Sequence, residues 1–277
     1  MTIGEALKNT SQKTGSDRNK KLELELLLSF VLKKERVFLF INHQQELSSN
    51  DYQKYQKLSK KLFSGWPLAY LIGEREFYGR SFLVNQSTLI PRPESEMIID
   101  LVKEESKKYP KATIIDIGTG SGCLIISLAK ELGTDYNYYG LDISSKALAV
   151  AKKNTKKHEV KINFKTSNLL SDLPKQAGKV FFLANLPYLT KEQVKNELSI
   201  KKEPKSALIS GKDGFKDYRY LFKQLSKRSD LKDFYLIIEI DPSQKELAIK
   251  ELQKYLPEKK VKIIKDLRKK NRFVIIN

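Results

Sequence analysis

The chain has 277 residues, of which 40% are hydrophobic and 10% aromatic; this is enough for a packed interior and excludes a wholly disordered chain. No apolar run reaches the roughly 18 residues that a membrane-crossing helix needs, and the polar, acid-containing start of the chain fits neither a secretory signal nor a transit peptide. The single cysteine, Cys123, excludes an internal disulfide, and with only two histidines a Cys/His zinc site is excluded as well. We therefore expect a cytoplasmic protein with no membrane partner and no metal.

The chain is strongly basic, because 52 Lys and Arg against 33 Asp and Glu give a formal charge of +19. Such a charge attracts polyanions such as RNA, or acidic proteins, over long distances. An excess made up mostly of lysine is also typical of proteins whose amino-acid usage reflects the composition of the genome and not a function. The densest stretch, residues 259–272, is either a basic patch or a solvated turn before the last strand; its cationic residues are Lys259, Lys260, Lys262, Lys265, Arg268, Lys269, Lys270 and Arg272.

Residues 1–74 have the pattern of a small helical domain. Residues 21–32 are dense in strong helix formers, and residues 34–40 fit a second helix. A third helix is expected after the cluster of N-capping residues at 48–51. Its apolar residues recur every three or four positions and predict one buried face; they are Tyr52, Tyr55, Leu58 and Leu62.

Residues 75–92 are predicted to link this helical domain to the next one. Aromatic and β-branched residues around Gly79 predict a β-hairpin over 77–89. The Pro-Arg-Pro sequence at 91–93 excludes a regular continuation and marks a domain boundary.

From residue 93 to residue 277 the pattern alternates between strand and helix. Short apolar runs of the buried-strand type alternate with helical segments, which indicates a mostly parallel sheet with helices on both faces. We therefore predict an α/β, Rossmann-like domain over 93–277. The predicted strands are 112–118, 136–142, 161–167, 179–185, 234–240 and 272–276, and the predicted helices are 94–108, 122–132 and 144–156.

A glycine-rich loop lies between the first strand and the first helix of this alternating pattern. Glycines allow a tight turn and let a ligand approach the main chain closely. The spacing is D-x-G-x-G-x-G rather than the G-x-G-x-x-G of a dinucleotide site; its residues are Asp116, Gly118, Thr119, Gly120, Ser121 and Gly122. An acid at this place would repel a pyrophosphate, but it suits the cationic amino-acid end of S-adenosylmethionine.

Asp142 closes the second predicted strand, where an acid can accept hydrogen bonds from both hydroxyls of a ribose. A glycine loop taken alone is also compatible with an ordinary turn. The strand before it, the helix after it and Asp142 in register together favour a cofactor loop. Cys123 follows the loop and is interpreted as a small buried residue, because no histidine is near it in sequence.

The fourth predicted strand ends in the tetrapeptide Asn185, Leu186, Pro187 and Tyr188. Ligands of an open parallel sheet bind at the carboxyl ends of its strands, so this motif is expected beside the glycine loop. The Asn185 side-chain oxygen and the Leu186 carbonyl can each accept one N–H of a substrate NH₂. Pro187 holds Leu186 in an extended shape, and Tyr188 can stack on a planar group. The alternative is a strand-ending turn without chemistry.

Two acceptors for one NH₂ point to methyl transfer onto an amide or an arylamine. The lone pair of such a nitrogen is delocalised, and the two acceptors return electron density to the nitrogen while they hold it in line with the S–CH₃ bond. No strong base is needed before transfer. The motif therefore predicts a methyltransferase that acts on a planar nitrogen.

These motifs together resemble the PrmC/HemK family, the protein-(glutamine-N5) methyltransferases of class-1 peptide chain release factors. The resemblance covers nearly the whole chain. Its N-terminal part is similar to the family's helical domain, and residues 67–96 are similar to its hairpin linker and Arg-Pro-Glu signature. Further matches are the loop Asp116–Gly122, the block Glu203-Pro204, Ala207-Leu208, Gly211, Asp213-Gly214 and Tyr218-Arg219, and the ending Asp266-Leu267 with Arg272.

The resemblance implies a Rossmann-like, class I S-adenosylmethionine-dependent methyltransferase domain behind a helical substrate-recognition domain, joined by a β-hairpin. The substrate would be the glutamine of the Gly-Gly-Gln loop of a class-1 release factor, and the product of the cofactor would be S-adenosylhomocysteine. The glycine loop, Asp142 and Asn185 would contact the cofactor, and the Asn185–Tyr188 motif would hold the glutamine. A monomer is expected.

The chain departs from the family pattern at two positions. The usual tetrapeptide is N-P-P-Y, and here Leu186 stands second; only its carbonyl is used, so we expect the change to be tolerated. The family pattern has an acid near the adenine, and Asn168 stands at that position here. Asn168 can still hydrogen-bond to the adenine edge, while Leu169 could pack on the adenine face. The alternative is that Asn168 is only a loop residue.

Several other residues have two interpretations. Arg92 and Glu94 could shape the entrance of the substrate pocket, or they could pair with each other at the start of a helix. Phe77 and Phe82 could wall the methyl site or serve packing alone. Glu239 ends an apolar strand and is interpreted as a structural ion-pair partner.

Two other substrates stay open. A ribosomal-protein glutamine methyltransferase would use the same catalytic domain, but the N-terminal resemblance favours release factors. An adenine N6-methyltransferase acting on RNA or DNA is suggested by the positive charge and by the N-L-P-Y form, which rRNA adenine dimethyltransferases also use. The block from Glu203 to Arg219 argues against it, so nucleic acid is not the favoured partner.

Overall fold

The computed structural model describes residues 1–231 and 233–277, and the chain forms two compact units. The first comprises Met1–Gly73 with Leu198–Lys202, and the second comprises Glu74–Glu197 with Glu203–Asn277. The division into 1–74, 75–92 and 93–277 stays a prediction. Within the described residues, no helix combines the length and the apolar character that a membrane span requires.

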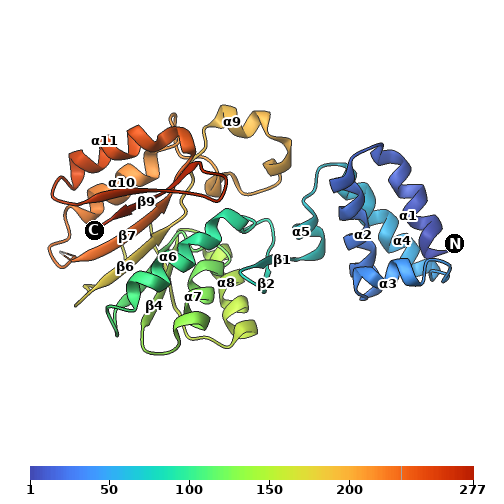
Figure 1. Cartoon of the computed structure of the whole chain (residues 1–277), viewed down its shortest axis with the longest axis horizontal. Coiled ribbons are helices and arrows are strands. Elements are labelled where there is room, and N and C mark those ends of the chain that lie inside the picture. Colours follow the sequence, from blue (N-terminus) through green and yellow to red (C-terminus); the bar gives the residue numbers. More distant parts are fainter. Residues whose placement is uncertain (232) are drawn as a thin grey trace. The chain divides into compact units, whose positions relative to one another are not determined.

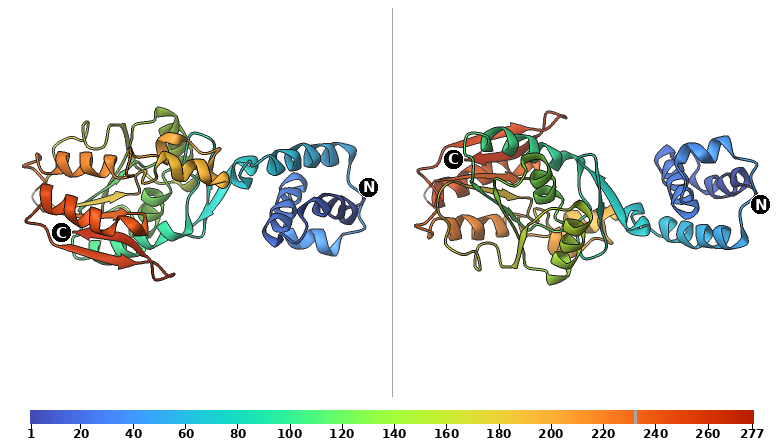
Figure 2. Two further views of the ribbon diagram at one scale, coloured as in Figure 1. Left: turned by 90° about the horizontal axis from the view of Figure 1, so that it is seen from above. Right: turned by 90° about the horizontal axis from the view of Figure 1, so that it is seen from below.

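The first unit is helical (Figures 1 and 2). Helices α2, α3 and α4 confirm the three predicted helices, whereas α1 and α5 had no separate prediction. Polar side chains cap the longer helices: Asp17 accepts the backbone N–H of Lys20 before α2, and Ser48 accepts that of Asp51 before α4. The helices are α1 (Ile3–Ser11), α2 (Arg18–Leu32), α3 (Arg36–Ile41), α4 (Ser49–Phe63) and α5 (Leu68–Ile72).

The first unit has its own hydrophobic core. Leucines that are three or four residues apart in α2 point to one side and are buried. They pack with Tyr55 of α4, whose hydroxyl is 2.8 Å from the Thr10 hydroxyl. The buried residues of this core are Ile3, Ala6, Leu24, Leu27, Leu28, Val31, Leu39, Tyr55 and Leu62.

The predicted hairpin is present and belongs to the second unit. Strand β1 (Glu74–Phe77) pairs antiparallel with β2 (Arg80–Leu83). Its two-residue turn has positive φ at both Tyr78 (50°) and Gly79 (67°), the left-handed geometry that suits a tight hairpin. Phe77 and Phe82 are buried edge to face, with ring centroids 6.2 Å apart. Both phenylalanines therefore serve packing, and Phe77 also lines the cavity described below.

A seven-stranded sheet forms the centre of the second unit, in the order β5-β4-β3-β6-β7-β9-β8. The pairs from β5 to β7 are parallel, while β9 runs antiparallel to both β7 and β8. The mostly parallel, Rossmann-like sheet is thus confirmed. Its strands are β3 (Thr113–Ile117), β4 (Asn137–Asp142), β5 (Asn163–Thr166), β6 (Val180–Ala184), β7 (Phe234–Glu239), β8 (Val261–Lys265) and β9 (Asn271–Ile276).

Helices cover both faces of the sheet (Figure 1). Helices α6 (Glu96–Ser106) and α7 (Cys123–Leu132) pack on one face, where α8 (Ser145–His158) follows α7, while α10 (Lys216–Leu225) and α11 (Lys245–Tyr255) pack on the other. β3, β6 and β7 are buried on both faces and are mostly apolar, with the acids Asp116 and Glu239 as exceptions. In the described part of the chain, the short elements are α9 (Lys191–Asn196) and the 3₁₀ turns Gln12–Thr14, Pro93–Ser95, Leu198–Ile200, Lys205–Ala207 and Pro242–Gln244.

The basic stretch at 259–272 is more than a turn, because it contains strand β8 and the hairpin to β9. Asp266 holds this hairpin: its carboxylate accepts the backbone N–H groups of Arg268 and Lys270 and pairs with Arg272 at 3.2 Å. Six of the eight cationic residues are exposed, whereas Lys259 and Arg272 are half-buried. The solvated turn is therefore only the tip of an edge hairpin.

Candidate active site

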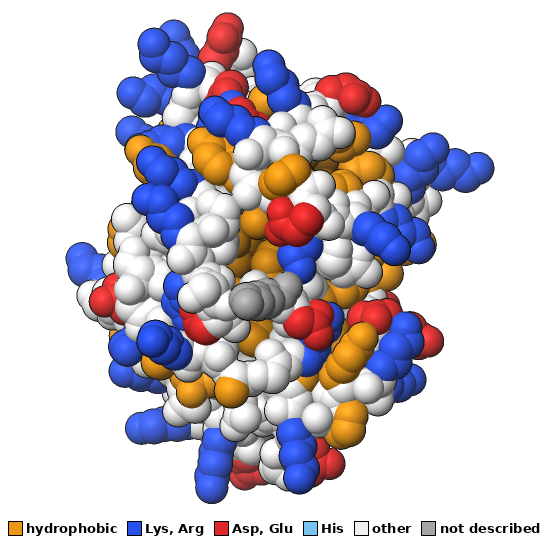
Figure 3. Space-filling view, turned by 90° about the vertical axis from the view of Figure 1, so that its left-hand side faces the viewer, with side chains coloured by type: hydrophobic (Ala, Val, Ile, Leu, Met, Phe, Trp, Pro, Cys, Tyr) orange, Lys and Arg blue, Asp and Glu red, His pale blue; other side chains and the backbone are white. Residues whose placement is uncertain are grey.

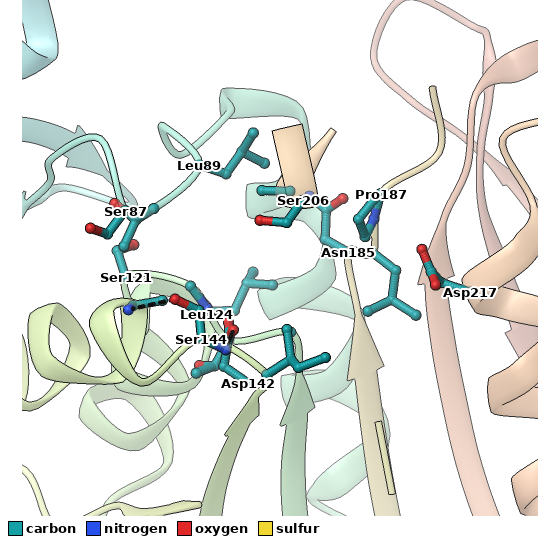
Figure 4. A pocket seen from close by; sticks show the side chains of 18 of the residues that line it. Ser87, Leu89, Ser121, Leu124, Asp142, Ser144, Asn185, Pro187, Ser206 and Asp217 are labelled. Carbon is teal, nitrogen blue, oxygen red and sulfur yellow. Dashed lines mark hydrogen bonds between the residues drawn. The ribbon is translucent and has the colours of Figure 1, made fainter. Parts of the chain in front are cut away.

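A cavity of about 350 Å³ lies at the carboxyl ends of β3, β4 and β6. This is within the range of small-molecule sites and at the place where open parallel sheets bind ligands. Figure 4 shows Asn185 and Pro187 on one side of the cavity and Ser87 and Ser121 on the other. Of the predicted site residues, those that line it are Arg92, Gly118, Thr119, Gly120, Ser121, Asp142, Asn168, Leu169, Asn185, Leu186 and Pro187.

The glycine loop requires glycine for two separate reasons. Gly118, Gly120 and Gly122 all have positive φ, between 56° and 80°, which side chains rarely adopt. A Cβ on Gly118 would also lie 2.9 Å from the Leu186 side chain. The loop thus approaches the tetrapeptide closely at Gly118, and residues of both predicted motifs line the same cavity.

Asp142 fixes the loop from the neighbouring strand. One of its carboxylate oxygens accepts the backbone N–H of Gly120 at 2.9 Å, and the other accepts that of Ser144 at 2.8 Å. Burial raises the pKa of this carboxyl, while the two backbone N–H groups lower it. Since each oxygen has a second lone pair, the carboxylate can still accept two hydroxyl groups from the cavity.

Asp116 does not line the cavity. Its buried carboxylate accepts the Thr119 hydroxyl at 2.7 Å and so supports the loop from behind. Burial, reinforced by the nearby charge of Asp142, raises the pKa of Asp116 to about 7. A cationic group bound nearby would lower that pKa, which agrees with the predicted preference for an ammonium; direct contact with it stays a prediction.

We expect Asp116→Asn to stabilise the unliganded protein at neutral and basic pH. The unfolded chain loses this proton near pH 4 and the folded chain near pH 7, so stability falls as the pH rises between these values. Asp116→Asn lacks this loss. Its advantage over wild type in the free energy of unfolding should therefore widen by about 2–3 kcal/mol between about pH 5 and about pH 8. Urea unfolding of both proteins at the two pH values measures it. An advantage that does not change with pH would contradict the shifted pKa.

Asn185 is held by hydrogen bonds from its amide nitrogen. Nδ2 donates to the Ser95 hydroxyl at 2.8 Å and to Glu239 Oε2 at 3.0 Å. Ser95 in turn donates to the same Glu239 oxygen at 2.5 Å. Within residues 1–231 and 233–277, Asn185 Oδ1 takes part in no hydrogen bond, and it is the atom left to bind a ligand.

Glu239 lies behind Asn185, and the prediction that it serves as an ion-pair partner is wrong. It is completely buried at the end of β7 and, in the described part of the chain, has no ion-pair partner within 4.0 Å. Its Oε1 lies 3.3 Å from the Tyr188 hydroxyl, which donates to it. Burial raises the pKa of Glu239, whereas the Ser95 hydroxyl and the positive charge of Arg272 lower it. Three donors therefore converge on one buried carboxylate.

The Tyr218 hydroxyl joins the ends of β6 and β7. It lies 3.1 Å from the Ala184 carbonyl and 2.5 Å from the Glu239 carbonyl, and it accepts the Leu186 backbone N–H at 3.2 Å. The Leu186 side chain is buried against the core, and its carbonyl accepts no hydrogen bond from the described residues. The Leu side chain in place of the usual Pro thus has a packing site of its own.

Tyr188 lies beside the cavity lining rather than in it. Its hydroxyl is bound to Glu239, and its backbone carbonyl accepts the Gln244 side chain at 3.0 Å. Burial raises the pKa of Tyr188, so the hydroxyl stays protonated and donates. Gly214, with φ of 73°, passes so close that a Cβ there would lie 2.2 Å from the Tyr188 carbonyl oxygen. This contact explains why residue 214 of the motif is glycine.

Arg92 pairs with Glu203 and not with Glu94, so the suggested pairing of Arg92 with Glu94 is wrong. Buried Glu203 also accepts the backbone N–H of Ile90 at 2.9 Å. Glu203 therefore fixes residues 90–92, which precede α6 and include the cavity-lining Arg92, to the loop before the 3₁₀ turn Lys205–Ala207. Glu94 is half-buried and does not line the cavity, and a role for it in substrate binding stays a prediction.

Asn168 and Leu169 both lie in the cavity wall after β5. The Asn168 carbonyl accepts the Ser171 hydroxyl at 2.8 Å and the Gln224 amide at 3.2 Å, which fixes the backbone. Leu169 has a φ of 56°, an uncommon conformation for a leucine. The loop is thus shaped so that both residues face the space where an adenine is predicted.

Comparison with known proteins agrees with this architecture. A model of the PrmC N-terminal domain matches residues 5–73, and a model of a methyltransferase domain matches residues 108–202. The hMettl16 catalytic domain, solved with a MAT2A 3′UTR hairpin, superposes with a TM-score of 0.57 over 90% of each chain at 18% identity. The T. thermophilus 16S rRNA N2 G1207 methyltransferase, solved with AdoMet and guanosine, gives 0.50 over 74% of this chain and 49% of its own at 12% identity. At such identities these likenesses show the methyltransferase fold alone.

Relatives of higher identity show the family. The release factor glutamine methyltransferase of Bacillus cereus is 35% identical over 99% of this chain and 98% of its own length. That of Dictyoglomus turgidum is 38% identical over 80% of this chain and 78% of its own. The match to the Bacillus cereus protein covers nearly the whole chain and so includes both units. The chain therefore belongs to the release factor glutamine methyltransferase family.

Proposed function

We propose that this chain transfers a methyl group from S-adenosylmethionine to the side-chain amide nitrogen (N5) of the glutamine in the Gly-Gly-Gln motif of class-1 release factors. The observation that carries the proposal is the pair of free acceptors at the end of β6. Asn185 Oδ1 and the Leu186 carbonyl are both without a donor in the described part of the chain. An amide NH₂ supplies the two donors that such a pair needs.

The cavity fits the proposed cofactor. Asp142 has two free lone pairs for a ribose, and Asn168 and Leu169 offer a polar edge and an apolar face for an adenine. The positive-φ glycines leave room for the amino-acid end beside the main chain. Bound there, S-adenosylmethionine supplies an electrophilic methyl group on a sulfonium.

The residues of the chain act on the glutamine by holding it. Asn185 Oδ1 and the Leu186 carbonyl accept its two N–H groups, so the nitrogen is fixed and enriched in electron density. Such orientation can contribute several kcal/mol to a barrier without an acid or a base. The extra N–H proton of the methylated amide can leave to water after transfer. Arg92 and Tyr188 shape the approach, and the helical unit recognises the rest of the release factor.

The direct test is mass spectrometry of a recombinant class-1 release factor after incubation with S-adenosylmethionine and this protein. We expect a mass gain of one methyl group, located by peptide analysis on the Gly-Gly-Gln glutamine. Asn185→Ala removes one of the two acceptors and should lower the rate by about 10²–10³-fold. A release factor whose motif glutamine is replaced serves as the substrate control.

A structured RNA in a parallel reaction tests the adenine alternative. Figure 3 shows Lys and Arg side chains scattered over the face in view, with Asp, Glu and hydrophobic side chains among them. Such a surface provides no concentrated track for a phosphate backbone on that face. Methyl transfer to the RNA without any gain on the release factor would overturn the proposed function.

A further inference from the structure

The Asn185 side chain has two orientations of nearly equal shape but opposite chemistry. Its amide oxygen and nitrogen are similar in size, and a 180° flip exchanges an acceptor for a donor. Facing a substrate NH₂, the flipped form would present N–H to N–H and repel it. The site therefore needs a device that selects one orientation before the substrate arrives.

The buried contacts of Asn185 supply such a device. Nδ2 lies 3.0 Å from Glu239 Oε2 and 2.8 Å from the Ser95 hydroxyl oxygen. Ser95 uses its own proton on Glu239, so it offers Asn185 a lone pair only. A flipped amide would bring Oδ1 against a carboxylate oxygen and that lone pair. Such an unpaired contact in a buried place is costly.

We propose that Glu239, assisted by Ser95, is a positioning residue for methyl transfer: it fixes the Asn185 amide with Oδ1 toward the acceptor nitrogen. The role rests on the proposed function, which supplies that nitrogen. A carboxylate bound to the amide N–H also polarises the amide and strengthens Oδ1 as an acceptor. Glu239 does not line the cavity itself, so it acts through the residues that it holds, of which Asn185 carries the acceptor oxygen.

A purely structural role is the competing explanation. Glu239 is completely buried, and its contacts join the start of α6, the end of β6 and Tyr188. Removal of any such group can lower stability and activity together. The two explanations differ in one respect: a positioning residue loses its effect on catalysis when Asn185 is absent.

Three variants weaken the hydrogen-bond acceptors of the Asn185 amide nitrogen to different degrees. Glu239→Gln keeps one acceptor oxygen and loses the charge, and we expect kcat to fall by about 10-fold or less. Glu239→Met keeps much of the volume and offers only a weak acceptor, and kcat should fall by about 100-fold. Ser95→Ala should lie between wild type and Glu239→Met. The KM for S-adenosylmethionine should change little in all three.

Each variant is then combined with Asn185→Ala under single-turnover conditions. We expect Glu239→Met and Ser95→Ala to cost almost nothing further in that background, because neighbours that act through one group are not additive. Glu131→Gln is the matched control: Glu131 lies on α7, pairs with Arg80 of β2 and Lys103 of α6, and lies outside the cavity lining. Full additivity, or wild-type rates in Glu239→Met, would overturn the positioning role. If Glu239→Met does not fold, the Ser95→Ala cycle decides in the same way.

Nuclear magnetic resonance of the free protein separates this proposal from the proposed function. The side-chain NH₂ signals of Asn185 are those lost in Asn185→Ala, and they need no substrate. We expect Glu239→Met to shift both signals and Glu131→Gln to leave them in place. If wild type fails to methylate the release factor, the proposed function fails while this readout still stands. Unshifted signals in Glu239→Met would refute the positioning contact.

Discussion

Asp142→Ala is expected to weaken the binding of S-adenosylmethionine by at least about 100-fold, because two hydrogen bonds to a charged group contribute about 1.5–3 kcal/mol each. The carboxylate holds Gly120 and Ser144 and leaves one lone pair on each oxygen. Its loss removes the predicted ribose acceptors and frees the glycine loop at once. Calorimetric titration with the cofactor and with S-adenosylhomocysteine measures the change.

Asp135→Ala is the control for lost charge, since Asp135 is exposed and precedes the same strand. Its affinity should match that of wild type. The cofactor affinity of Asp142→Asn should lie between those of wild type and Asp142→Ala, because the amide retains one acceptor oxygen while its NH₂ meets a backbone N–H. An Asp142→Ala protein that is folded and binds the cofactor like wild type would refute the ribose contact.

The fold could be predicted because its signals are local. The alternation of apolar runs with helical segments predicts the sheet. The positions of the strand ends predict that Asp142 and the Asn185 motif lie at one edge of it. Strand β8 was not predicted because it lies at the sheet edge, where two lysines among its five residues make it resemble a solvated stretch. Helix α1 was not predicted either, although Thr2 and Glu5 form a capping box at its start.

The support of the site could not be predicted, because it joins distant parts of the chain. Ser95 and Asn185 are 90 positions apart, and Asn185 and Glu239 are 54 apart. Nothing in the local sequence distinguishes Glu239 from an acid at the end of any strand. Asn185 and Glu239 meet because β6 and β7 are neighbours in the sheet, and Ser95 joins them from the turn before α6. Spacing identifies groups that meet a ligand, whereas the groups behind them depend on tertiary packing.

Gly214→Ala is expected to lower the free energy of unfolding by about 4 kcal/mol or more and to abolish methyl transfer. A Cβ there would lie 2.2 Å from the Tyr188 carbonyl oxygen and 2.6 Å from the Gln244 side-chain nitrogen. The backbone of Tyr188 cannot move away without disturbing the tetrapeptide that carries Asn185 and Leu186. Chemical denaturation and the release factor assay together measure both effects.

Gly178→Ala separates the steric effect from the conformational one. Gly178 also has positive φ, 76°, but a Cβ there would meet nothing within 4 Å. Its replacement should cost only about 1–2 kcal/mol, the usual penalty of a left-handed alanine, and should leave methyl transfer intact. The excess loss in Gly214→Ala then measures the contact with Tyr188. Equal losses in the two variants would show that the loop at 213–214 yields without moving the tetrapeptide, and that the motif holds its place by other contacts.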